Sequence, residues 1–375
     1  MYTVGVVGAG GIFPSHLAAY RYLSKRFRLI GVSDTDAARL RQAGQEHFLP
    51  VATTNYHELL DRPDLDIIDV CTPPGVHAQI VRDALAADKY VICEKPLAPT
   101  LEQIDELIEL EKGFPGKLST VFQRRYAKPV EKLMQAKDDG SLGRLVGGTF
   151  NRTAQGAFMR TAKNWGSWAM AGGGTVMTQF VHELDLLCLV YGPAARVSAI
   201  MDTVQLNIES EDAFAASILF RNGAIVSCSS STGVGKSGVS FDVVGSQKIY
   251  RYVSSSDDGG RTRRLARYRE LATKAIRAAK NRILSKLGRP TGPKGDGGSH
   301  RPYFEAILNA LDVEQPLPVG PADARWAVEL ATAIYTSAIT GTPVDLPLDS
   351  SATYYRGITA ADYENRSRLA PPTEP

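Results

Sequence analysis

The chain has 375 residues, 43% of them hydrophobic and 22% charged, with a formal net charge of +3 at neutral pH. These proportions are close to the globular average and exclude a collagen-like, coiled-coil or disordered chain. Four cysteines without a close pair exclude a disulfide scaffold and a cysteine-rich zinc site, so we expect no metal. No apolar run is long enough to span a membrane and no signal peptide precedes the first apolar run, which predicts a cytoplasmic protein.

The first part of the chain alternates short apolar runs with stretches of helical spacing. The apolar runs, which suit buried parallel strands, lie at residues 3–8, 28–32, 66–71 and 90–93. The helical stretches lie near residues 14–24, 36–46, 56–61 and 76–87. This alternation predicts an α/β domain with a doubly wound parallel sheet over residues 1–122. Thr100 and Gln103 have the spacing of a capping box at the start of one more helix.

The pattern changes in the second part of the chain. Runs of strand length lie at residues 145–152, 196–203, 213–220, 224–231 and 239–252. Asn222-Gly223 between two of them is a strong hairpin signal. Helical spacing returns near residues 174–190, 302–312 and 322–340. We therefore predict an α+β domain with a mainly antiparallel sheet over residues 123–348, followed by a tail over 349–375 that is loose after about residue 360.

A glycine cluster follows the first strand directly. Gly8, Gly10 and Gly11, with Ile12, precede a helix, so the backbone there can approach a pyrophosphate at the helix N-terminus. Phe13 replaces the third glycine of the dinucleotide-binding fingerprint, and a tight turn without a ligand is the alternative. The position of the turn favours a cofactor site.

Asp34 ends the second strand, where a carboxylate can accept the ribose hydroxyls of an adenosine and repel a 2′-phosphate. Because no arginine follows immediately, the sequence predicts NAD rather than NADP. An N-cap of the following helix is the alternative role of Asp34.

Further motifs follow the later strands and precede the helix near 174–190. They are Thr72-Pro73-Pro74 with His77, Glu94-Lys95-Pro96, and Gly172-Gly173-Gly174 with His182 and Asp185. With the glycine turn, these motifs resemble the Gfo/Idh/MocA family from residue 3 to about residue 348. The resemblance implies an N-terminal Rossmann domain, a C-terminal domain with an open sheet that often mediates homo-oligomers (dimer or tetramer), and cofactor contacts from Thr72, Pro73, His77, Glu94 and Lys95.

The resemblance also implies the catalytic residues. Lys95, at the end of a strand, contacts the reacting hydroxyl or carbonyl; a surface lysine paired with Glu94 is the alternative. His182 corresponds to the family's catalytic histidine, and on a helix it shares one face with Thr178 and Asp185. Relatives usually have Asp or Asn at position 178, so an Asp–His dyad is not expected. A buried histidine bonded to Asp185 is the alternative for His182.

Two segments are candidates for substrate contacts. Arg125, in Arg124-Arg125-Tyr126, lies where the family often has an arginine–aromatic pair. Trp165 precedes the glycine triplet, where an aromatic ring can stack on a sugar; core packing is its alternative.

A basic segment at residues 261–289 holds 11 of the 43 basic residues and one of the 40 acidic residues. It lies in an insertion over about residues 254–300 and has the spacing of an amphipathic helix. The alternatives are peripheral membrane contact, a surface for nucleotide-sugar phosphates or an acidic neighbouring subunit, and a solvated helix packed on its own domain. We expect no nucleic-acid partner, because no recognition motif accompanies it.

Together these features predict an NAD-dependent oxidoreductase of a polyol such as a cyclitol, a sugar or a nucleotide sugar. Two alternatives remain: a non-catalytic dinucleotide-sensing regulatory protein, and an enzyme that recycles tightly bound NAD, such as an epimerase or a redox-coupled glycosidase.

Overall fold

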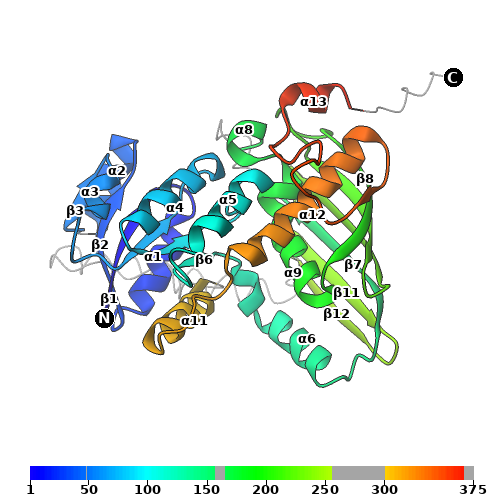
Figure 1. Ribbon diagram of the computed structural model, residues 1–375, viewed down its shortest axis with the longest axis horizontal. Helices are drawn as coiled ribbons and strands as arrows, with labels where there is room; N and C mark the ends of the chain where they lie inside the picture. The colour runs from blue at the N-terminus through cyan, green and yellow to red at the C-terminus, as the bar shows by residue number, and fades with distance from the viewer. Residues whose placement is uncertain (48, 157–164, 256–299, 367–375) are drawn as a thin grey trace, which may run out of the picture.

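The computed structural model describes residues 1–47, 49–156, 165–255 and 300–366 (Figure 1). The basic segment at 261–289 lies outside these residues, so its proposed roles stay predictions. Within the described residues, no helix has both the length and the apolar character needed to cross a membrane.

The first part of the chain forms a six-stranded parallel sheet in the order β3-β2-β1-β4-β5-β6. Its strands are β1 (Tyr2–Val7), β2 (Phe27–Ser33), β3 (Val51–Thr53), β4 (Ile67–Val70), β5 (Tyr90–Cys93) and β6 (Leu118–Thr120). The strand order reverses direction at β1 and β4, where doubly wound sheets bind ligands beyond the carboxyl ends of the strands. The predicted doubly wound sheet is confirmed.

Helices connect these strands. They are α1 (Phe13–Tyr22), α2 (Ala37–His47), α3 (His57–Leu60), the 3₁₀ turn η1 (Pro74–Val76), α4 (His77–Ala86) and α5 (Leu101–Glu111). Thr100 caps α5 by accepting a hydrogen bond from the backbone N–H of Gln103 at 3.2 Å, which confirms one half of the predicted capping box.

After η2 (Gln123–Tyr126) and α6 (Lys128–Asp138), the chain forms a seven-stranded sheet in the order β12-β11-β7-β10-β9-β8-β13. The strands are β7 (Leu145–Ala154), β8 (Ala194–Asp202), β9 (Ala213–Phe220), β10 (Ile225–Thr232), β11 (Gly238–Gly245), β12 (Ile249–Ser255) and β13 (Val344–Asp345). The pairs are antiparallel except β10 with β7, so the mainly antiparallel sheet is confirmed. The predicted single run at 239–252 is two strands, because the chain turns between Gly245 and Lys248.

Helices lie against this second sheet. They are α8 (Trp168–Ala171), the π turn η3 (Val176–Phe180), α9 (Val181–Tyr191) and α12 (Pro321–Thr340). α12 contacts β8 and α9 of the second domain and helix α5 of the first domain, so it packs between the two domains (Figure 1). α11 (His300–Asp312) packs against α1, so this late segment of the chain is part of the first domain's helical layer. The tail expected to be loose after residue 360 instead begins with a capped helix, α13 (Ala360–Glu364), because Thr359 and Asp362 form a capping box.

Candidate active site

A cavity of about 1300 Å³ lies beyond the carboxyl ends of β1, β2, β4 and β5. This exceeds the roughly 300–1000 Å³ typical of a site for one small ligand. The predicted site residues that line it are Gly8, Gly10, Gly11, Ile12, Asp34, Thr72, Pro73, Glu94, Lys95, Trp165, Thr178 and His182. His77 and Arg125 are not among its lining residues.

The glycine turn forms one end of the cavity. Gly8 has φ +104°, and a Cβ there would lie 2.6 Å from the carbonyl oxygen of Cys71, so only glycine fits. Around Gly11 no atom lies within 4 Å of the Cβ position, which leaves this backbone open to a ligand. Ile12 precedes α1, makes no side-chain cap hydrogen bond and lines the cavity, so the helix begins at the cavity wall. These features fit a pyrophosphate at a helix N-terminus.

Asp34 is held by the backbone on both carboxylate oxygens. Oδ2 accepts the N–H of Ala9 and Oδ1 accepts the N–H of Asp36, each at 2.8 Å. Asp36, not Asp34, caps α2, since its Oδ1 accepts the N–H groups of Ala38 and Arg39. The N-cap alternative for Asp34 is therefore wrong. Arg39 also lines the cavity, with Nη1 3.4 Å from Asp34 Oδ2. It lies in the first turn of α2, five residues after Asp34, so it does not follow Asp34 directly in the sequence.

His77 supports the site from outside the cavity. Its two ring nitrogens lie 2.9 Å from the carbonyl oxygen of Pro96 and 2.8 Å from that of Thr72. Burial lowers the pKa of the ring. His77 thus ties together two segments that follow β4 and β5, and the expected direct cofactor contact has no support from its position.

Lys95 and His182 face the same cavity from different parts of the chain. The Nζ of Lys95 donates to the carbonyl oxygen of Thr178 at 2.8 Å. Burial lowers the pKa of Lys95 to about 8, although the Glu94 carboxylate opposes that shift. His182 is 5% exposed, and its Nδ1 has no hydrogen-bond partner among the described residues. Burial, together with the charges of Lys95 and two arginines, holds the pKa of His182 well below its usual value.

Thr178 lies in the π turn, whereas His182 and Asp185 lie on α9, so the three residues do not form the predicted face of one regular helix. The Thr178 hydroxyl donates to the carbonyl of Gly174 at 2.6 Å, so it does not orient the His182 ring. Asp185 does not reach that ring either, because the Arg125 guanidinium binds its carboxylate at 2.6–3.1 Å. The alternative in which Asp185 satisfies a buried His182 is wrong. Arg125 also bonds Asp323 at 3.2 Å, so its position does not support the expected substrate contact.

A buried carboxylate that sequence analysis missed anchors the start of the π turn. Glu211 accepts the N–H groups of Gly174 and Val176 at 2.9 Å and the hydroxyl of Tyr335 at 3.0 Å. Burial raises its pKa to about 7, against these hydrogen bonds. Glu211 therefore fixes the backbone that leads to Thr178 and His182.

Trp165 and its near neighbour Trp168 have different environments. Trp165 lines the cavity. Trp168 is buried, and its Nε1 donates to the carbonyl of Glu209 at 3.1 Å, while its ring lies edge-on to Tyr335. Trp168 therefore belongs to the core.

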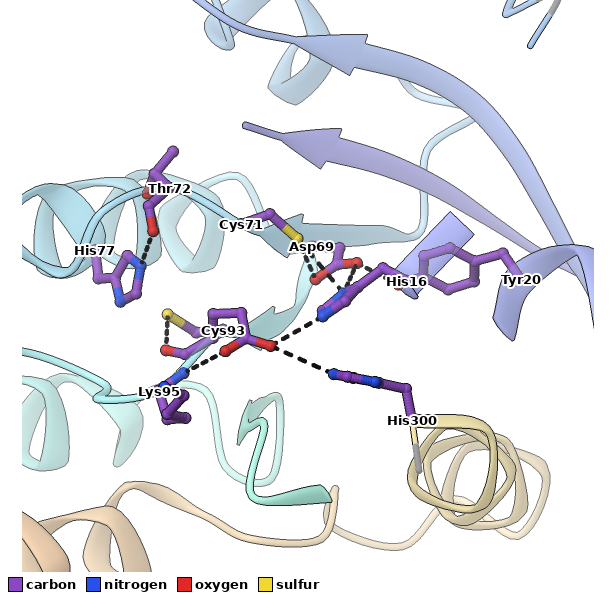
Figure 2. A network of polar contacts seen from close by, with 10 residues as sticks. His16, Tyr20, Asp69, Cys71, Thr72, His77, Cys93, Lys95 and His300 are labelled. Carbon is purple, nitrogen blue, oxygen red and sulfur yellow. Dashed lines mark hydrogen bonds and ion pairs between the residues drawn. The ribbon is translucent and has the colours of Figure 1, made fainter. Parts of the chain in front are cut away.

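Sequence analysis also missed a buried polar network behind Glu94, shown in Figure 2. His16 Nδ1 lies 2.8 Å from Asp69 Oδ2, and His16 Nε2 lies 3.0 Å from Glu94 Oε1. His300 Nε2 lies 3.8 Å from the same Glu94 oxygen. The ligand atoms of His16, Glu94 and His300 are close enough for a metal ion. However, carboxylates already engage both nitrogens of His16, so hydrogen bonds account for its contacts without an ion.

The sheet order, the glycine turn and a cavity closed by a second α+β domain define a two-domain dinucleotide-binding protein. Residues 2–120 match the model of the Gfo/Idh/MocA oxidoreductase family with an NAD-binding Rossmann fold, and residues 130–251 match a C-terminal domain model of that family. The chain belongs to the Gfo/Idh/MocA family of oxidoreductases, and its first domain is an NAD-binding Rossmann fold.

Two curated relatives show how far the sequence likeness extends. Myo-inositol 2-dehydrogenase of Thermotoga maritima is 32% identical over 141 residues, which cover 38% of this chain and 42% of that protein. The uncharacterized oxidoreductase YrbE of Bacillus subtilis is 24% identical over 230 residues, which cover 59% of this chain and 64% of that protein. The chain therefore spans less than two thirds of the length of these relatives.

The likeness in structure extends further. The WlbA dehydrogenase of Bordetella pertussis, solved in complex with NADH and UDP-GlcNAcA, has a TM-score of 0.76 at 23% identity. The match covers 92% of this chain and 99% of that chain. This likeness confirms the two-domain fold.

Proposed function

We propose that this protein is an NAD-dependent oxidoreductase that transfers a hydride between the nicotinamide and a hydroxyl carbon of a polyol, sugar or nucleotide sugar. One observation carries the proposal: Lys95 and His182 line the same cavity as the glycine turn and Asp34. The names of the relatives support the substrate class, since one is an inositol dehydrogenase and another was solved with a nucleotide sugar.

The residues at one end of the cavity fit the cofactor. The open backbone at Gly11, just before α1, would hold the pyrophosphate, and Asp34 would accept ribose hydroxyls. When bound, NAD supplies the hydride acceptor at C4 of its nicotinamide. The Lys95 and His182 side chains then border the part of the cavity left for substrate.

The charges at the site divide the proton chemistry between these two side chains. An amine with a pKa of about 8 exists in both forms near neutral pH, so Lys95 can take the hydroxyl proton as the hydride leaves carbon, and return it in the reverse direction. The lowered pKa of His182 keeps its imidazole neutral at pH 7. Because His182 lines the cavity, its neutral imidazole can form a hydrogen bond with a substrate hydroxyl and orient it. Lys95 is the proton carrier and His182 the orienting group.

The test combines a substrate screen with one substitution. Purified protein is mixed with NAD and cyclitols, free sugars or UDP- and GDP-sugars, and the nicotinamide absorbance is followed. We expect the oxidation of the active substrate by NAD to become faster as the pH rises through about 8, because the neutral amine accepts the proton. Lys95→Met should lower kcat by about 10²-fold or more while NAD still binds, given the usual contribution of general acid–base catalysis.

The matched control is Lys112→Met, which removes an exposed lysine paired with Glu109 and should leave kcat unchanged. Full turnover by Lys95→Met would refute the assignment of Lys95. NAD retained through purification, with no net change in absorbance, would favour the recycling enzyme. NAD binding without turnover of any substrate would favour the sensing protein.

A further inference from the structure

The network behind Glu94 contains a histidine whose two nitrogens both face carboxylates. Asp69 and Glu94 lie at hydrogen-bond distance on opposite sides of the His16 ring, and carboxylate oxygens only accept hydrogen bonds. Because both partners are carboxylates rather than neutral carbonyls, they favour a proton on each ring nitrogen, which makes His16 an imidazolium. Burial is the largest single effect and disfavours this charge, but the Asp69 carboxylate and the Cys71 side chain together outweigh it and hold the pKa of His16 well above its usual value.

The elements around His16 supply no further full charge within hydrogen-bond reach among the described residues. His16 lies on α1 and is 0% exposed. In the described part of the chain, four polar side chains face it. Asp69 lies in β4 and Cys71 directly follows that strand, Glu94 directly follows β5, and His300 lies on α11. Tyr20, one turn along α1, donates its hydroxyl to Asp69 at 2.7 Å. Figure 2 shows these side chains converging between α1, β4, β5 and α11.

Glu94 connects this buried charge to the catalytic lysine. Its Oε1 faces His16, while its Oε2 accepts the backbone N–H of Lys95 at 3.1 Å. Glu94 and Lys95 both line the cavity, whereas His16 and Asp69 do not. Two carboxylates, one imidazolium and one ammonium balance to zero net charge when Lys95 is protonated.

We propose that His16 and Asp69 form a buried ion pair that fixes the position and charge of Glu94 and, through Glu94, the protonation of Lys95. They are positioning residues for the proton transfer, and this role rests on the proposed function. The remaining charged and titratable groups around Lys95 come from the second part of the chain: Arg124 on η2, Arg152 on β7, and His182 and Glu183 on α9.

The charge balance makes opposite predictions for two variants. His16→Gln removes the cation and leaves two buried carboxylates with Lys95 as their only compensating partner within the network, so Lys95 should keep its proton to higher pH. The double variant His16→Gln/Asp69→Asn removes one charge of each sign and restores the balance of the unmodified protein. Its Lys95 should therefore titrate close to the original pH.

The experiment measures Lys95 without any substrate. An amine-selective reagent labels the neutral form of lysine, and mass spectrometry of the Lys95 peptide gives the extent of labelling against pH. We expect the midpoint for Lys95 to rise by about one pH unit or more in His16→Gln, because a positive charge close to Lys95 is lost. The double variant should return the midpoint toward that of the unmodified protein, while Lys112, labelled in the same sample, should not change.

Either of two results overturns the proposal. The Lys95 midpoint is unchanged in His16→Gln, or it lies further from the unmodified value in the double variant than in His16→Gln. A purely packing role predicts the second of these results, because two core substitutions disturb the fold more than one. Since labelling needs no turnover, a failure of the dehydrogenase assignment would leave this result readable.

If His16→Gln does not fold, NMR of the nitrogen-labelled imidazoles of the unmodified protein decides instead. One histidine should remain doubly protonated at pH 8, and its signal should persist in His77→Gln, which removes the other ring with two close acceptors. The absence of such a signal overturns the proposal.

Discussion

At the scale of single residues, we expect Asp34 and Arg39 together to control which dinucleotide the cavity accepts. Asp34 presents a carboxylate fixed by two backbone N–H groups, and Arg39 lies beside it on the cavity wall. The carboxylate repels a 2′-phosphate, whereas a guanidinium attracts one. In the unmodified protein the carboxylate of Asp34 is buried and fixed, and the 54% exposed Arg39 side chain is partly neutralised by Asp34 and Asp36.

This pairing makes a directional prediction. Asp34→Ser should raise the ratio of kcat/KM for NADP over NAD by about 10- to 100-fold, since each tenfold change corresponds to about 1.4 kcal/mol. The substitution removes the repulsive charge and leaves Arg39 available for the phosphate. Asp64→Ser is the control, because Asp64 pairs with Arg62 and does not line the cavity, and it should not change the ratio. An unchanged ratio in Asp34→Ser would show that Asp34 does not face the ribose.

At the scale of elements, motifs at strand ends were predictable from the sequence, and contacts between elements were not. Lys95 and the glycine turn follow apolar strands, and the carboxyl ends of parallel strands meet at one edge, so sequence order alone brings them together. The strands β3 and β6 have three residues each, too few for a pattern. The π turn depends on Glu211, which lies 35 residues or more from the N–H groups it binds.

The network behind Glu94 had a weak signal in the sequence. Asp69 is a charged residue inside the apolar run of β4, and a carboxylate in such a place needs a buried partner. Its partner His16 is 53 residues away, and the periodicity of α1 marks His16 only as an inward-facing position. The local sequence pattern therefore indicates that the Asp69 carboxylate has a buried partner, but it does not identify that partner as His16.

Arg125 joins three elements, and this explains why it is absent from the cavity. From η2 it bonds Asp185 on α9 and Asp323 on α12. Asp185 is 1% exposed, and burial raises its pKa to about 6 despite the arginine. The pair therefore holds the domain junction against the helix that bears His182.

Removal of this arginine should reduce stability rather than substrate affinity. Arg125→Gln leaves the Asp185 carboxylate buried without a cation, and breaking such a pair costs about 3–5 kcal/mol at most. Urea unfolding should show a lower free energy of unfolding, with KM for the active substrate unchanged in the folded enzyme. Arg125→Gln/Asp185→Asn should recover part of the loss, because no unpaired charge remains. A raised KM with unchanged stability would instead support the original prediction that Arg125 contacts the substrate.

At the scale of the whole molecule, the second sheet has two unlike faces. Helices α9 and α12 lie along one face, and α12 contacts β8 (Figure 1). Large apolar side chains on the strands remain exposed, among them Ile200 at 72%, Ile225 at 61% and Val253 at 61%. Small side chains of β7, β8, β9 and β10 line a shallow hollow between the strands. An exposed apolar sheet of this kind indicates an association surface.

We therefore expect a dimer or tetramer formed through this sheet, as the family resemblance also implies. A second copy of the chain would bury the exposed apolar side chains, and a symmetric contact would use each of them twice. Ile200→Glu should shift the mass measured by light scattering toward a smaller species, because each interface would then bury two unpaired carboxylates. Val313→Glu is the matched control, since Val313 is 64% exposed after α11 and away from the sheet. If the unmodified protein has the mass of a monomer at micromolar concentration, the exposed sheet face has another role.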